Sequence, residues 1–127
     1  MCDRPNGELR CKVTVGGAVT SGKGINLPES NIKAPAITDK DWTCVEWAVE
    51  HELDFLALSF VRHADEVKSL KEKLRSLEAR KRGVGVLTEA DGVQNIGVVS
   101  KIEKPQAIAN LNSIVEASDA SELWRYR

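Results

Sequence analysis

The sequence predicts an α/β fold with a parallel sheet, and three observations lead to this class. Residues 54–60 contain too few polar side chains for a strand with one wet face, which is typical of a strand covered by helices on a parallel sheet. Residues 97–103 form a second apolar segment of strand character, and an amphipathic helix over 64–80 lies between the two. A strand, a helix and a strand in this order form a βαβ unit with a right-handed crossover. We therefore expect two parallel strands whose carboxyl ends meet at the same edge of the sheet.

The helices are predicted from capping signals and apolar periodicity. Thr38 followed three residues later by Asp41 is a capping box, and apolar residues at helical spacing continue from there to about His51. The helix over 64–80 has a solvated charged face and an apolar stripe. This stripe consists of Val67, Leu70, Leu74 and Leu77. A last helix begins at Pro105, because proline is tolerated in a first helical turn, and it continues for about ten residues.

Two stretches lack this alternation of helices and strands. Residues 1–33 contain an alternating segment at 8–15, a glycine pair and a second short extended piece at 18–20. These features predict a small β hairpin that runs into a linker. Glycines punctuate residues 81–96, which predicts a long loop with a small extended piece around 84–87.

Composition restricts the classes of function. The chain has 127 residues, 42% hydrophobic and 29% charged, and 18 basic against 19 acidic residues leave a net charge of -1, which gives no sign of a nucleic-acid partner. Three cysteines, Cys2, Cys11 and Cys44, are odd in number and lack metal-ligand spacing, which favours reduced thiols. No apolar run spans a membrane and no signal-peptide core is present. We expect a soluble cytoplasmic protein with neither nucleic acid nor membrane as a partner.

A candidate site lies where the second predicted strand ends. Lys101 and Glu103 are two residues apart, so on an extended chain their side chains share one face. A cation and a carboxylate at the end of a buried strand hold each other, a metal ion or an anionic ligand; the alternatives are an exposed ion pair and the first turn of the next helix. Parallel pairing brings Ser59, Phe60 and Arg62 to the same edge, which carries the chemistry in barrels of this class.

Five segments of the chain resemble pyruvate kinase, in the family's order and at nearly its spacing. Residues 22–28 (GKGINLP) resemble the return of the chain from the small lid domain into the barrel, and 35–41 (PAITDKD) resemble the helix start that follows. Residues 54–62 (DFLALSFVR) are similar to the fourth barrel strand, 100–103 (SKIE) to the fifth, and 114–119 (IVEASD) to the approach to the sixth. The resemblance implies part of a (β/α)8 TIM barrel, about two parallel strands with their helices, preceded by a short β hairpin from a lid domain.

The resemblance also implies a division of the chain. Residues 1–24 correspond to the end of the lid domain and a linker, 25–120 to part of the barrel domain, and 121–127 to a tail that does not match. In the family the strand after Asp119 ends in an aspartate that completes the metal site, and this residue has no counterpart here. We therefore expect an internal piece of the enzyme.

The activity implied by the resemblance is the glycolytic transfer of a phosphoryl group from phosphoenolpyruvate to ADP, which yields pyruvate and ATP. Lys101 takes the position of the catalytic lysine, and Glu103 that of a carboxylate that ligates Mg²⁺ or Mn²⁺. Ser59, Phe60 and Arg62 match positions that support the substrate site. The family also uses K⁺, whose ligand segments are missing here, and its members are homotetramers. We expect no residues for an organic cofactor.

Three hypotheses remain open at this point. The chain is a pyruvate kinase fragment whose activity belongs to a parent enzyme, a non-catalytic remnant that acts as a binding module, or part of another metal-dependent barrel enzyme that handles an enolate. We expect the 127-residue chain alone to be inactive. We also expect it to bind Mg²⁺ weakly, because it offers one carboxylate in place of two.

Overall fold

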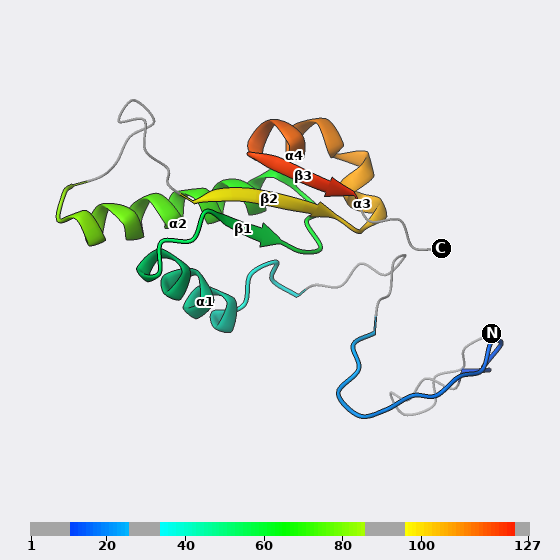
Figure 1. Ribbon diagram of the computed structural model, residues 1–127. Coiled ribbons are helices and arrows are strands. Elements are labelled where there is room, and N and C mark those ends of the chain that lie inside the picture. Colours follow the sequence, from blue (N-terminus) through cyan, green and yellow to red (C-terminus); the bar gives the residue numbers. More distant parts are fainter. Residues whose placement is uncertain (1–10, 26–33, 86–95, 124–127) are drawn as a thin grey trace.

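The computed structural model describes residues 11–25, 34–85 and 96–123, and these contain four helices and one three-stranded sheet (Figure 1). The elements in chain order are α1 (Asp39–Glu50), β1 (Phe55–Leu58), α2 (Ala64–Arg82), β2 (Gly97–Ile102), α3 (Pro105–Ala109), α4 (Leu111–Ala117) and β3 (Ala120–Leu123). The strand order is β1-β2-β3, and both pairings are parallel. The predicted α/β class is confirmed. None of the described helices combines the length and the apolarity needed to cross a membrane.

The boundaries of the two long helices follow from local chemistry. Thr38 and Asp41 form the predicted capping box, in which the Asp41 N–H donates to the Thr38 hydroxyl at 3.3 Å and the Thr38 N–H donates to the Asp41 carboxylate at 2.8 Å. Helix α2 continues two residues beyond the predicted end at Arg80. It stops at Gly83, which adopts the left-handed conformation (φ 67°) that glycine takes without steric cost.

The core lies between one face of the sheet and the helices. Strand β2 alternates, so that Val98, Ser100 and Ile102 are buried, while the residues between them point to the other face. Buried side chains from all four helices join this face. They are Val45, Ala48 and Val49 of α1, Val67, Leu70, Leu74 and Leu77 of α2, Ala107 of α3 and Ile114 of α4.

The opposite face of the sheet is open in the described part of the chain. Phe55 is 61% exposed and pairs in register with Gly97. A Cβ atom on Gly97 would lie 2.8 Å from the Phe55 ring, so the ring rests against the glycine and would have to shift to admit a larger residue. Lys101 belongs to this same face, two residues beyond Val99.

Strand β3 corrects the expectation of about two parallel strands. Residues 120–123 extend into the segment predicted as a non-matching tail, and they pair in parallel with Val99–Ile102. All four β3 residues are exposed, so the sequence there carries no apolar pattern that would predict a strand. The strand forms because its backbone pairs with β2, not because it buries side chains.

Asp119 fixes the point at which β3 joins the sheet. Its N–H donates to the Val98 carbonyl at 3.0 Å, and one carboxylate oxygen accepts from the Val98 N–H at 2.7 Å. The other oxygen lies 2.9 Å from the Lys71 ammonium of α2. One side chain therefore connects β3, β2 and the helix that covers them.

The described part of the N-terminal segment differs from the predicted hairpin. Residues 11–25 contain no strand, and their apolar side chains are exposed, from Val13 at 76% to Val19 at 90%. A two-stranded hairpin that packs its apolar face on nothing is marginal in water, which accounts for the difference. Residues 8–10 of the predicted hairpin lie outside the described residues.

Two further expectations change. The helix predicted from Pro105 onward is divided into α3 and α4 by Asn110, whose backbone (φ −109°, ψ 16°) leaves helical geometry. The loop predicted to begin at Lys81 begins after α2, at Gly83. Residues 86–95, which hold half of the predicted extended piece at 84–87, lie outside the described residues.

The Asp119 linkage predicts an acid-dependent loss of stability. Partial burial raises the pKa of the Asp119 carboxyl, but the Val98 hydrogen bond and the Lys71 ammonium outweigh burial and hold the pKa below its usual 3.8. Because the folded pKa is the lower one, the stabilisation is fully present above about pH 4 and is lost as the pH falls through the folded pKa. Asp119→Asn should lower the free energy of unfolding in urea at pH 7, and this difference from the wild type should shrink below about pH 4.

The matched control is Asp65→Asn on α2, whose side chain is 92% exposed. This substitution should leave the acid dependence of unfolding close to that of the wild type. An Asp119→Asn chain that keeps the full acid dependence of the wild type would contradict the role given to this carboxylate.

Candidate functional site

Lys101 and Glu103 form an ion pair at the carboxyl end of β2. The Lys101 ammonium lies 3.2 Å from one Glu103 oxygen and donates to the Ser59 hydroxyl, which directly follows β1, at 3.3 Å. The Lys101 side chain is 22% exposed and that of Glu103 only 6%. The parallel pairing of β1 and β2 brings these three residues together, because the carboxyl ends of both strands lie at one edge. The ammonium therefore sits in a partly desolvated position, where its charge acts more strongly than in water.

The second Glu103 oxygen accepts a hydrogen bond from the Phe60 backbone. The distance from the Phe60 nitrogen to this oxygen is 3.0 Å. Phe60 has φ 56°, a left-handed conformation that costs a non-glycine residue about 1–2 kcal/mol. This unusual conformation directs the Phe60 N–H toward Glu103, so both oxygens of the carboxylate have donors. The Phe60 ring, 44% exposed, lies 5.6 Å from the Lys104 ammonium.

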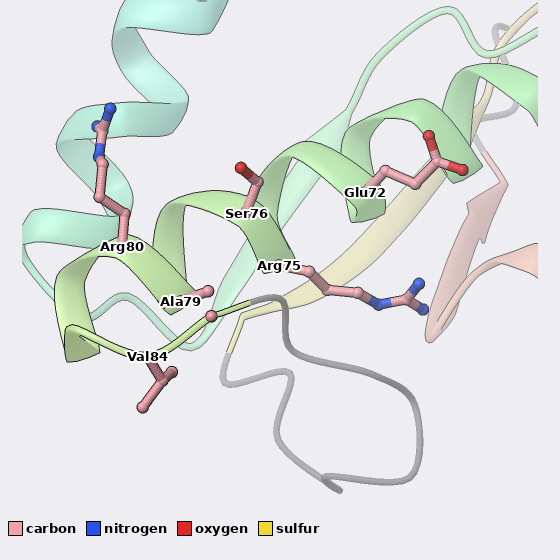
Figure 2. A pocket seen from close by; sticks show the side chains of 7 residues that line it. Glu72, Arg75, Ser76, Ala79, Arg80 and Val84 are labelled. Carbon is pink, nitrogen blue, oxygen red and sulfur yellow. The ribbon is translucent and has the colours of Figure 1, made fainter.

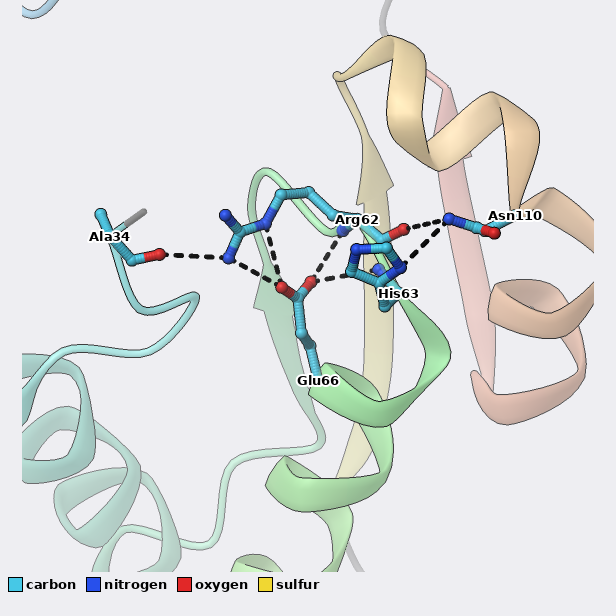
Figure 3. A network of polar contacts seen from close by, with 5 residues as sticks. All are labelled: Ala34, Arg62, His63, Glu66 and Asn110. Atoms are coloured by element: carbon cyan, nitrogen blue, oxygen red, sulfur yellow. Dashed lines mark hydrogen bonds and ion pairs between the residues drawn. The ribbon is translucent and has the colours of Figure 1, made fainter. Parts of the chain in front are cut away.

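Arg62 lies at the same edge but takes part in a different set of contacts. Its guanidinium forms a salt bridge with Glu66 of α2 at 2.8 Å and donates to the Ala34 carbonyl at 3.2 Å (Figure 3). The Glu66 carboxylate also accepts from the backbone N–H of Arg62 at 2.7 Å. The predicted group is thus divided: Ser59 and Phe60 contact the Lys101–Glu103 pair, and Arg62 holds the turn that carries them.

Two residues at this edge were missed by sequence reasoning. Glu66, at the third position of α2, had a usable signal, because an acidic residue there commonly accepts from the backbone before the helix. Asn110, between α3 and α4, donates to the Arg62 carbonyl at 2.9 Å (Figure 3). Nothing in the local sequence marks Asn110, since its partner is 48 residues away.

The residues at this edge do not by themselves fit a metal ion. Within residues 11–25, 34–85 and 96–123, no cluster of three or more His, Cys, Asp and Glu side chains could hold one. Glu103 is the carboxylate that faces the site, and both of its oxygens already have donors within the chain. Mg²⁺ demands near-octahedral oxygen ligands. We therefore assign Glu103 the task of holding Lys101 and Phe60 in this chain.

A hollow of about 470 Å³ lies elsewhere, along the C-terminal half of α2 and the turn after it (Figure 2). It is lined by Glu72, Arg75, Ser76, Ala79, Arg80, Val84 and Gly85. The turn that carries Ser59, Phe60 and Arg62 contacts the opposite end of α2, through Glu66. This hollow therefore contains none of the predicted site residues.

The conformation of Phe60 leads to a prediction with an unusual sign. Because glycine adopts a positive φ without the penalty of a Cβ atom, Phe60→Gly should have a larger free energy of unfolding than Phe60→Ala, by about 1 kcal/mol. The exposed Ser76 in the middle of α2 is the matched control, and there alanine should exceed glycine by a similar amount. Urea unfolding of the four variants tests this pair of signs. A Phe60→Ala chain more stable than Phe60→Gly would show that the turn is not left-handed at this residue.

Comparisons with known proteins agree with the motifs and the geometry. The sequence model of the family described as pyruvate kinase, barrel domain, matches residues 1–125. A pyruvate kinase of Staphylococcus saprophyticus is 37% identical over 117 residues (92% of this chain, 18% of that protein), and one of Thermococcus litoralis is 35% identical over 118 residues (93% and 22%). The chloroplastic pyruvate kinase isozyme G of Ricinus communis is 35% identical over 117 residues (92% and 24%).

The extent of these matches fits the partial sheet. The chain spans about a fifth of the length of the curated relatives that it matches. The described strands are three parallel neighbours, as expected for part of a barrel of alternating strands and helices. With the family model covering nearly the whole sequence, the chain belongs to the pyruvate kinase family.

Proposed function

We propose that this chain is a fragment of a pyruvate kinase whose parent enzyme transfers the phosphoryl group of phosphoenolpyruvate to ADP, which yields pyruvate and ATP in glycolysis. The observation that carries the proposal is the position of Lys101. Its ammonium lies within 3.3 Å of both Glu103 and Ser59, at the carboxyl ends of neighbouring parallel strands. Barrel enzymes place their reacting groups at this end. Family membership favours this hypothesis over another enolate-handling barrel enzyme.

Each site residue has a proposed role that follows from its contacts. Lys101 stabilises the negative charge that develops on the phosphoryl group and on the enolate oxygen, because a positioned cation in a partly desolvated site costs little reorganisation. Glu103 and the Ser59 hydroxyl orient this ammonium. Phe60 supports Glu103 through its N–H, and Arg62 anchors the turn through Glu66.

The metal ions of the family belong to the proposal for the parent enzyme. Glu103 occupies the position of a family carboxylate that ligates Mg²⁺ or Mn²⁺, and K⁺ is the second ion that the resemblance implies. Since the described residues do not form a complete ligand set, we expect weak Mg²⁺ binding by this chain. The proposed partners of the parent are phosphoenolpyruvate, ADP and ATP, in a homotetramer. A cytoplasmic location is likewise a proposal, and two relatives carry chloroplastic names.

The partial sheet keeps a non-catalytic remnant as a second candidate. Within the described residues β1 and β3 are the outer strands of a three-stranded sheet, and such a sheet cannot close into a barrel. One face of this sheet exposes Phe55 and Ala57. An open sheet edge and an open apolar face suit the binding of a partner better than catalysis.

We expect no phosphoryl transfer by the 127-residue chain on its own. Lys101 is held in place, but a single cation supplies only part of the charge stabilisation that phosphoryl transfer requires. A coupled assay that follows pyruvate formation from phosphoenolpyruvate and ADP with Mg²⁺ should give the background rate. Turnover above background that disappears in Lys101→Ala would contradict this expectation.

The role of Lys101 is best tested in a hybrid enzyme. Residues 34–119 of this chain would replace the aligned segment of the Staphylococcus saprophyticus pyruvate kinase, and the hybrid should transfer phosphoryl groups. Lys101→Ala in the hybrid should lower kcat by about 10²–10³, the typical effect of removing one preorganised charge-stabilising group. The control is Lys68→Ala on α2, whose side chain is 63% exposed, and it should leave kcat unchanged. A fully active Lys101→Ala hybrid would refute the proposed role of Lys101.

A further inference from the structure

Asn110, at the junction of α3 and α4, contacts the turn between β1 and α2, which consists of residues 59–63. The side-chain nitrogen of Asn110 donates to the carbonyl oxygen of Arg62 at 2.9 Å and lies 3.2 Å from Nδ1 of His63 (Figure 3). It also donates to the carbonyl oxygen of Gln106 at 3.1 Å. Two of these partners are carbonyl oxygens, which can only accept. The contacts therefore require the amide nitrogen, and not the amide oxygen, to face the turn.

The Arg62 backbone is consequently fixed on both of its polar groups. Its N–H donates to Glu66 at 2.7 Å, and its carbonyl accepts from Asn110. Glu66 belongs to the first turn of α2, and Asn110 joins α3 to α4. Two different parts of the helical layer thus restrain a single residue of the turn.

The restrained residue, Arg62, is connected to the site by the backbone of Val61 and Phe60. Val61, between Phe60 and Arg62, is fully buried in the core. Because Val61 is packed in the core and both backbone polar groups of Arg62 are hydrogen-bonded, few backbone conformations remain for Phe60. The one observed has φ 56° at Phe60 and directs the Phe60 N–H at Glu103.

Asn110 makes these contacts from a backbone conformation that is not helical. The apolar periodicity predicts one continuous helix from Pro105, but the backbone of Asn110 (ψ 16°) divides it into two short ones. A break in a helix removes backbone hydrogen bonds and has to be offset by others. The bond to the Arg62 carbonyl is one of those that offset it.

We propose that Asn110 is a positioning residue of the Lys101–Glu103 site, which acts through the Arg62 carbonyl on the turn that presents the Phe60 N–H to Glu103. The significance of this role for catalysis rests on the function proposed above. The geometric role itself is independent of activity. The competing explanation is that burial of Val61 alone sets the turn and that Asn110 serves only the junction between two helices.

The test uses the ¹⁵N-labelled 127-residue chain and observes the Phe60 amide by NMR. In Asn110→Ala the Phe60 amide proton should move toward the shift seen in Glu103→Ala, and its hydrogen exchange should accelerate about fivefold, the effect of losing one ordinary hydrogen bond. Asn112→Ala, two residues along in α4, is the matched control and should change neither signal. A Phe60 amide that is unchanged in Asn110→Ala would overturn the proposal, whatever happens to global stability.

A second variant and one measurement on the unmodified chain cover the case in which Asn110→Ala does not fold. Asn110→Asp keeps the size of the side chain but has no hydrogens to donate, so it should affect the Phe60 amide as alanine does. In the wild-type chain, a scalar coupling across the hydrogen bond should connect the Asn110 side-chain nitrogen with the Arg62 carbonyl carbon. Its absence would overturn the proposal without any substitution.

The two proposals fail in separate experiments. An active Lys101→Ala hybrid enzyme contradicts the proposed function and says nothing against the turn. An unresponsive Phe60 amide contradicts the positioning role and says nothing against Lys101. In an active hybrid, Asn110→Ala should lower kcat about fivefold with little change in the KM for phosphoenolpyruvate, because a slight displacement of the site weakens interactions made in the transition state.

Discussion

The buried carboxylate of Glu103 is the constraint on which the rest of this edge depends. A carboxylate that is 6% exposed is costly unless its oxygens have donors. Lys101 supplies one donor and the Phe60 N–H the other. The first donor follows from the two-residue spacing of Lys101 and Glu103 at the end of β2. The second requires that β1 and β2 are parallel and end together, and that a left-handed residue follows β1. Both the sheet pairing and the strained turn can therefore be understood as conditions for keeping this charge inside the protein.

The covering helices contribute more than an apolar layer. Helix α2 provides Glu66 for the turn at one end of the sheet and Lys71 for Asp119 at the start of β3. Asn110 adds a restraint from the α3–α4 junction. These polar contacts join the strand ends to the helices at defined points, whereas the apolar core fixes only the layers. In the described residues, the sheet face that carries Phe55 has no such covering layer.

Sequence patterns predicted the parts of the fold that local physics determines. The Thr38 capping box, the parallel strand β1 and the shared face of Lys101 and Glu103 follow from residues close together in the chain. Strand β3 was not predictable, because its four exposed residues form a strand only by pairing with β2. Asn110 was not predictable either, since its main partner lies 48 residues away and depends on how α3 packs. The N-terminal hairpin was predicted from an alternating segment, a glycine pair and a second extended piece, and none of these guarantees a surface to pack on.

The central claim is that Lys101 and Glu103 hold each other at the site in a partly desolvated pair. A double-mutant cycle with Lys101→Met and Glu103→Gln, followed by urea unfolding of the 127-residue chain, measures this interaction most directly. We predict a favourable coupling free energy of about 1–3 kcal/mol that changes little with added salt, because the pair is shielded from solvent. A coupling near zero, or one that vanishes in moderate salt, would contradict the account and would make the pair an ordinary surface ion pair.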